Sequence, residues 1–154
     1  MNRTTISYTD GHIYEFSPNL DPIYTASNGE SLTFETIDSL NKEIQSNEDL
    51  LHSIPDEVNA ATGPVAVEDA EPGDVLKVDI EAIRVNEDQG RVVTAPEFGL
   101  LQDHEEIEHP FTRVTPVDES AESIQFNDID IPIKPVIGTI GVATESEVIP
   151  TLTP

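Results

Sequence analysis

The sequence predicts an all-β protein, arranged as a β-sandwich or a jelly-roll-like fold with one short helix. Two observations carry this prediction: short segments in which apolar and polar residues alternate recur along the chain, and turn signals separate them. Many short strands at regular spacing are typical of sandwiches and barrels. The length of 154 residues suits one domain with a modest core. We therefore expect a single β domain over residues 1–154.

The segment 74–85, DVLKVDIEAIRV, is the clearest predicted strand. Its apolar side chains at Leu76, Val78 and Ile80 would lie on one face, with charged residues on the other. The alternation then changes phase, because Ile83 and Val85 fall on the opposite parity. A β-bulge near Ala82 would return them to one buried face.

Four further segments are predicted as strands: HIYEF (12–16), SLTFETID (31–38), the stretch 90–95 and IDIPIKPVI (129–137). In the first, His12 falls on an aromatic face and is expected to be a packed core residue. The last contains Pro132 and Pro135, and proline cannot donate a hydrogen bond within a sheet. We therefore expect that strand at an edge or at a bulge.

Turns and one helix complete the predicted organisation. SNGE (27–30) is typical of a hairpin loop, and AEPGD (70–74) places Pro-Gly at the centre of a type II turn. The best helix candidate is 39–54, which carries an imperfect apolar stripe of Leu40, Ile44, Leu50 and Leu51. The acidic stretch 100–123 is expected to be an exposed loop.

The charge balance excludes several classes of partner. The chain has 31 acidic and 7 basic residues, a net charge of −24. Such a surface repels phosphate backbones and anionic lipids, so we expect neither nucleic acid nor membrane as a partner. An acidic chain with few aromatic residues can be disordered, or it can be folded and adapted to high salt. The strand pattern favours the folded, halophilic alternative.

Other features indicate the compartment. The chain has no cysteine, which excludes disulfides and thiolate zinc sites and is consistent with a reducing environment. The first residues, MNRTTISYTDGH, contain no apolar core of a signal peptide. No apolar run approaches the roughly 18 residues that span a bilayer. We therefore expect a soluble, cytoplasmic protein.

Three stretches, in order, resemble the acetamidase/formamidase family. They are SNGESLTFETID (27–38), VNAATGPVAVEDAEPGDVLKVDIEAI (58–83), and EFGLL (97–101) followed by IPIKPVIGTIGVA (131–143). The second is the most specific, because it is similar to the family pattern Asn-Pro-Ala-Thr-Gly-Pro, a strand, then Gly-Ala-Glu-Pro-Gly-Asp. Two positions depart from the pattern: Ala60 replaces a usual proline and Asp69 a usual glycine.

The resemblance implies the N-terminal part of a larger β-rich amidohydrolase that converts a small linear amide, formamide or acetamide, to ammonia and a carboxylate. In the family, the stretch similar to 137–154 leads to a His-Gly-Gly-Asn motif, and this sequence ends before it. We therefore expect a truncated domain that needs a complementing C-terminal chain or a homo-oligomer, and that is inactive alone. The alternative is a non-catalytic β-sandwich for binding or assembly, or a decayed fragment.

The resemblance also implies carboxylate and histidine ligands for a divalent metal, zinc or calcium. A metal could activate water and stabilise the oxyanion of amide hydrolysis. Glu35 and Asp38 in FETID are the first candidates, both for catalysis and as metal ligands. They would face opposite sides of a continuous strand, but a strand that ends near Thr36 could bring them together. The alternative is a solvated edge carboxylate and a turn-starting aspartate.

Asn59, Thr62 and Gly63 in NAATGP are candidates for substrate binding. Their side chains and a bare backbone N–H could serve a substrate carbonyl or an oxyanion. The alternative is plain turn chemistry, in which Asn and Thr bond to nearby backbone.

The stretch HEEIEH, His104 to His109, has a misleading similarity to the zinc-protease helix. That motif needs histidines four apart, whereas these are five apart and Glu108 stands at the fourth position. His104 and Glu108 could share a metal on one helical turn before Pro110. The favoured interpretation is an exposed acidic loop.

Overall fold

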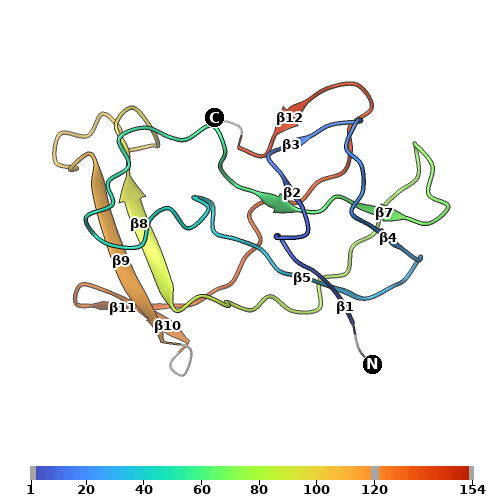
Figure 1. Cartoon of the computed structure of the whole chain (residues 1–154). Coiled ribbons are helices and arrows are strands. Elements are labelled where there is room, and N and C mark those ends of the chain that lie inside the picture. The colour runs from blue at the N-terminus through green and yellow to red at the C-terminus, as the bar shows by residue number, and fades with distance from the viewer. Residues whose placement is uncertain (1–2, 119–121, 153–154) are drawn as a thin grey trace. The chain divides into compact units, whose positions relative to one another are not determined.

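The computed structural model describes residues 3–118 and 122–152, and Figure 1 traces their strands. All regular structure in these residues is β, which confirms the predicted fold class. The same residues contain no helix, so the short helix predicted over 39–54 is wrong. Consistent with this, the described chain has no helix that could cross a membrane. The chain divides into two compact units, one within residues 1–41, 57–79 and 138–154, the other within 42–56 and 80–137.

The first unit is built from four pairs of short strands. Two pairs are parallel: β1 (Thr4–Ile6) with β5 (Leu32–Phe34), and β4 (Tyr24–Ala26) with β7 (Val65–Val67). Two are antiparallel: β2 (His12–Ile13) with β6 (Ala61–Thr62), and β3 (Glu15–Phe16) with β12 (Ile149–Pro150). The buried apolar side chains of this unit are Ile6, Ala26, Leu40 and Val58. Ile6 and Ala26 lie on strands, whereas Leu40 and Val58 lie in the irregular segments between them, so both kinds of segment supply the core.

The second unit contains one four-stranded antiparallel sheet in the order β11-β10-β9-β8. Its strands are β8 (Gln89–Thr94), β9 (Phe111–Asp118), β10 (Ser123–Phe126) and β11 (Ile129–Pro132). Strands β8 and β9 pair over six residues, with Arg91 opposite Val114. β11 lies at the edge of the sheet, as predicted from Pro132 and Pro135, and it ends at Pro132, short of the predicted Ile137.

Residues 42–56 form an irregular loop in place of most of the predicted helix. Asn41 and Lys42 have φ angles of 54° and 63°, which an α-helix does not allow. The Asp49 carboxylate accepts the N–H groups of Gln45 and Ser46 at 2.9 and 2.8 Å, where a helix would use carbonyl oxygens. Ile44 and Leu51 are nevertheless buried. The apolar stripe therefore predicted the burial of Leu40, Ile44 and Leu51 correctly, whereas Leu50 is 43% exposed and the predicted helical backbone is wrong.

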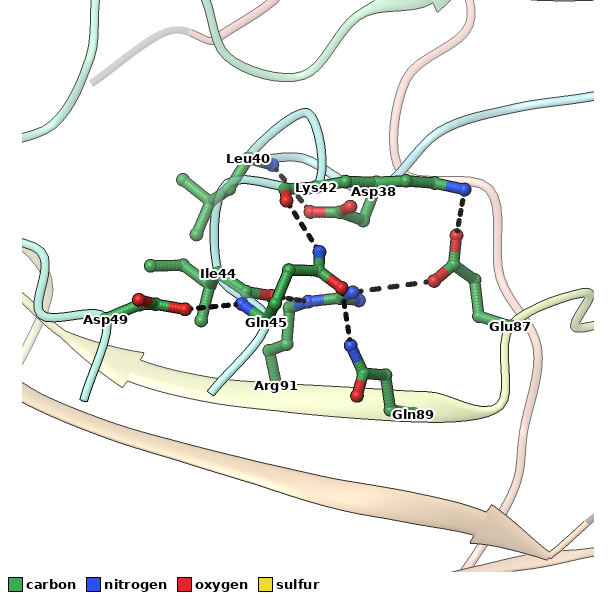
Figure 2. Close-up of polar contacts among 9 residues, drawn as sticks. All are labelled: Asp38, Leu40, Lys42, Ile44, Gln45, Asp49, Glu87, Gln89 and Arg91. Carbon is green, nitrogen blue, oxygen red and sulfur yellow. Dashed lines mark hydrogen bonds and ion pairs between the residues drawn. The ribbon is translucent and has the colours of Figure 1, made fainter. Parts of the chain in front are cut away.

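Polar contacts hold this loop on strands β8 and β9, and Figure 2 shows those to β8. The Arg91 guanidinium donates to the Ile44 carbonyl and lies 3.5 Å from Glu87, whose carboxylate also pairs with Lys42 at 3.1 Å. Gln89 donates to the side chain of Gln45. On β9, the Thr112 hydroxyl donates to the Asp49 carbonyl at 2.7 Å and the Val114 N–H to the Asn47 side chain at 2.8 Å. The loop is therefore fixed by side chains.

The segment 75–86 is the second correction, because it belongs to none of the strands in the described chain. Its apolar side chains are exposed: 93% for Val75, 53% for Leu76, 52% for Val78 and 61% for Ile80. The bulge expected near Ala82 is consequently absent as well, since a bulge requires a paired strand. The alternation of apolar and polar residues predicted a strand that pairs with a neighbouring strand. In the described chain, residues 75–86 pair with no strand.

Both predicted turns form. Gly73 has φ 101° and Asp74 donates to the Glu71 carbonyl, as a type II turn requires. The Glu30 N–H donates to the Ser27 carbonyl at 3.0 Å. This turn is no hairpin, because the strands on either side, β4 and β5, pair with β7 and β1 instead of with each other.

Candidate functional site

Two segments of the first unit carry the predicted site residues, and the structure places them side by side. The Thr62 hydroxyl donates to the Glu35 carbonyl at 2.8 Å. Asn59, three residues before Thr62, donates its N–H to the Ser39 carbonyl at 2.9 Å, and Ser39 follows Glu35 in the chain. The stretch from Glu35 to Ser39 therefore runs antiparallel to the stretch from Asn59 to Thr62. The two candidate groups, distant in sequence, share one surface region.

The two carboxylates in this region differ in their surroundings. Glu35 directly follows β5, its N–H extends the pairing with β1 by donating to the Ile6 carbonyl, and its side chain is exposed. Asp38 is half-buried, and its carboxylate accepts the Leu40 N–H at 2.9 Å (Figure 2). This bond is the turn-starting contact that the alternative interpretation of Asp38 describes. Glu35 is thus the carboxylate that is presented to solvent.

The NAATGP residues use much of their hydrogen-bonding capacity within the fold. Gly63 is buried with φ 134°, a conformation that favours glycine, and its N–H donates to the Gly11 carbonyl at 3.1 Å. The bare N–H expected for an oxyanion is therefore already bonded. The Thr62 hydroxyl donates its hydrogen bond to the backbone carbonyl of Glu35, so the hydroxyl oxygen can still accept a hydrogen bond. Asn59 has φ 56°, a left-handed conformation that asparagine tolerates, and is half-buried.

His12 lies in the same region, although its sequence pattern predicted a core residue and not a site residue. It stands opposite Thr62 in the β2–β6 pair, so the two side chains project from the same face. The imidazole is exposed, which corrects the expectation of a core residue. Its Nδ1 lies 2.9 Å from the Tyr8 carbonyl, and its ring meets Tyr14 edge-on at 5.4 Å.

The contact with Tyr8 determines the chemistry of this histidine. A carbonyl oxygen can only accept, so Nδ1 must carry the proton. In the neutral imidazole, Nε2 is then the acceptor, the form that takes a proton from water or a substrate. A sequence feature that could have indicated an exposed histidine is its position directly after Gly11, at the start of a short strand.

The stretch His104 to His109 contains turns and no helix, as the favoured interpretation holds. Nδ1 of His104 accepts the Glu106 N–H, and Nε2 of His109 lies 3.2 Å from the Leu101 carbonyl. Across residues 3–118 and 122–152, no group of three or more His, Asp or Glu side chains could hold a metal ion. Catalytic zinc sites use three protein ligands. The described residues therefore contain no such group of three ligands, and the zinc or calcium implied by the family resemblance stays a prediction.

Comparison with solved structures places these observations in a family. A predicted acetamidase/formamidase of Thermoanaerobacter tengcongensis is 36% identical, with a TM-score of 0.85, and the match covers 96% of this chain and 48% of that one. Acetamidases of Bacillus halodurans and Yersinia enterocolitica are 29% and 26% identical, with TM-scores of 0.77 and 0.82. Their matches cover 95% and 99% of this chain and 48% and 50% of theirs. This chain thus spans about half the length of these relatives.

Comparison by sequence gave two findings. Among curated proteins, nothing matches this chain. The Acetamidase/Formamidase family, however, matches residues 4–153, which is nearly the full sequence. The chain belongs to the acetamidase/formamidase family.

Proposed function

We propose that this chain is one half of an amidohydrolase that converts a small linear amide, formamide or acetamide, to ammonia and a carboxylate. The observation that carries the proposal is the adjacency of Glu35–Ser39 and Asn59–Thr62 in a chain of this family. The chain spans about half the length of its solved relatives. The proposal includes a partner polypeptide with the other half of the family fold, as the family resemblance of the sequence implies. Cytoplasmic location and halophilic adaptation stay predictions.

Amide hydrolysis needs a group that takes a proton from water and donors that stabilise the developing oxyanion. Glu35 is exposed and is proposed as the catalytic base. Asp38, three residues further along the chain, is proposed as the second catalytic carboxylate. His12 is proposed as a second proton acceptor through Nε2, because Tyr8 holds its Nδ1–H. Glu35 and His12 both lie next to Thr62.

The substrate amide is proposed to bind through Asn59 and Thr62. The Asn59 side-chain amide would donate to the substrate carbonyl oxygen, and the Thr62 oxygen would accept from the substrate N–H₂ group. Gly63 would contribute shape instead of a donor, because its N–H is bonded to Gly11. These contacts would hold a small planar amide near Glu35.

A divalent metal, zinc or calcium, remains part of the proposal only together with the partner polypeptide. Glu35 and Asp38 would then be two of its ligands. The described residues of this chain supply no group of three ligands, so no catalytic step is assigned to a metal here.

The test is ammonia release from formamide and acetamide in concentrated KCl, with zinc or calcium added. We expect no activity from the chain alone and activity when it is produced together with the other half of the Thermoanaerobacter tengcongensis relative. Glu35→Gln should abolish that activity, His12→Asn should alter its pH profile, and Glu43→Gln, an exposed acid outside the site, should leave it unchanged. Activity of the chain alone would contradict the proposed division of the site.

A second function is favoured by one observation: Thr62, Gly63 and Asp38 all use polar groups within the fold. A non-catalytic module for binding or assembly would need no more than that. This function replaces the first if the two halves form a stable complex that releases no ammonia.

A further inference from the structure

The segment 75–80 is the part of the chain whose exposure is hardest to reconcile with its sequence. It reads VLKVDI, contains neither proline nor glycine, and belongs to no strand of the described chain. Val and Ile favour paired strands because their branched side chains pack on a pleated surface. Here Val75, Leu76, Val78 and Ile80 are each more than half exposed. Such an exposed row of apolar residues marks an interaction site.

The charged residues of the segment indicate which of its side chains lie on the same face. The Lys77 ammonium lies 2.9 Å from the Asp79 carboxylate, so these side chains, two residues apart, project to the same side. In an extended chain the residues between and beside them project to the opposite side. Leu76 and Val78 would therefore share an apolar face once the segment is extended as a strand.

We propose that residues 75–80 dock as a β-strand against the other half of the acetamidase/formamidase fold, with Leu76, Val78 and Ile80 facing it. This inference rests on the proposed need for a partner polypeptide and names the surface that the partner covers. Main-chain hydrogen bonds to a neighbouring strand would supply affinity, and the apolar face would supply specificity.

The other half of the fold is a better occupant than a second copy of this chain. The relatives with solved structures are about twice as long, and the match to the Yersinia enterocolitica acetamidase covers 99% of this chain, which leaves too few unmatched residues to omit the segment. The same segment thus occurs in proteins that contain about as much additional polypeptide. A second copy would bring a further net charge of −24, which opposes association.

Strand β11 provides a contrast within the same molecule. It is also an exposed edge, but it carries Asp130 and ends in Pro132, features that prevent further strand pairing. The stretch 138–142 exposes Ile140 and Val142, but Gly138 and Gly141 interrupt it. The segment 75–80 also carries two charges, Lys77 and Asp79, but they pair with each other, and it has neither proline nor glycine, so it is the surface of the three best suited to pairing.

The test is co-production of this chain with a tagged other half of the Thermoanaerobacter tengcongensis relative, followed by hydrogen exchange on the purified complex. We expect slower exchange at residues 75–80 in the complex than in the chain alone. Val78→Asp should lower the yield of complex at least about tenfold, because it places a charge on the apolar face that the partner is proposed to bury. Lys77→Ser, on the opposite face, is the matched control and should leave the yield unchanged.

Each other outcome has a defined meaning. No complex, or a complex that is insensitive to Val78→Asp and unprotected at 75–80, overturns the inference even if it releases ammonia. A concentration-dependent dimer of this chain alone, abolished by Val78→Asp, also overturns it, because the occupant is then a second copy. A complex protected at 75–80 that releases no ammonia supports the docking strand and contradicts the proposed activity. Circular dichroism of Val78→Asp alone should match the unmodified chain.

Discussion

The loop 42–56 and the segment 75–86 both carried an apolar pattern in the sequence, an imperfect helical stripe and a clear strand alternation, and they differ in how far the structure buries their apolar side chains. The loop lost its predicted helix, yet it buries Ile44 and Leu51 and is bonded to β8 and β9. The segment lost its predicted strand pairing and leaves its apolar side chains exposed. Periodicity thus reports which side chains need burial, while specific polar contacts determine which backbone can provide it.

The largest test of this comparison is a matched pair of leucine substitutions. Leu51 is 7% exposed and Leu76 is 53% exposed. Leu51→Ala should destabilise the second unit by about 2–4 kcal/mol, because it removes buried methyl groups and leaves a cavity. Leu76→Ala should cost less than about 0.5 kcal/mol in the chain alone. Native-state hydrogen exchange measures both, and equal losses would contradict the contrast.

A smaller effect is expected from a matched pair of cation substitutions. The Arg91 side chain is 9% exposed and bonds to both the Ile44 carbonyl and Glu87. Arg91→Met should weaken the loop by about 2 kcal/mol, since it removes a charged donor from a buried acceptor. Lys77 forms an exposed pair with Asp79, so Lys77→Met should cost at most about 0.5 kcal/mol.

Exchange rates of the loop amides measure the effect of Arg91→Met, and thermal unfolding of the whole chain that of Lys77→Met. An unchanged loop in Arg91→Met would show that apolar burial alone holds it. In that case the polar contacts in Figure 2 would be a consequence of the loop conformation and not its cause.

The all-β class and strands within 12–16, 31–38, 90–95 and the first part of 129–137 could be predicted, because each combines local alternation with turn residues. The helix over 39–54 could not be rejected from sequence. What opposes it is the side chain of Asp49 taking the N–H groups of Gln45 and Ser46, together with bonds from β8 and β9, which are distant in sequence. Side-chain bonds of this kind leave no periodic signal.

The site was predictable to a similar extent. Glu35, Asp38, Asn59, Thr62 and Gly63 do lie in one unit, and their adjacency depends on the Thr62–Glu35 and Asn59–Ser39 bonds that the motifs themselves do not reveal. His12 was missed because its exposure results from strand pairing with Thr62, which connects residues fifty positions apart. Their functional roles stay predictions.

The smallest expected effect concerns pH and the same loop. Hydrogen bonds from the backbone N–H groups of Gln45 and Ser46 lower the pKa of Asp49 below its usual value. A lowered pKa in the folded chain means that the carboxylate stabilises the loop above the usual value, about 4, and that this contribution is lost as pH falls through the lowered pKa. The loop should therefore be unaffected between about pH 7 and 5 and loosen only in stronger acid.

An NMR titration in concentrated KCl follows this directly through the Asp49 side-chain carboxyl carbon and the amide protons of Gln45 and Ser46. All three signals should share one midpoint, below that of an unstructured aspartate. Asp49→Asn should remove the pH response of both amides, while the amide protons of the segment 75–86 should respond equally in both proteins. A midpoint at or above the usual aspartate value would mean that the carboxylate does not hold the loop, and that the buried Ile44 and Leu51 do so without it.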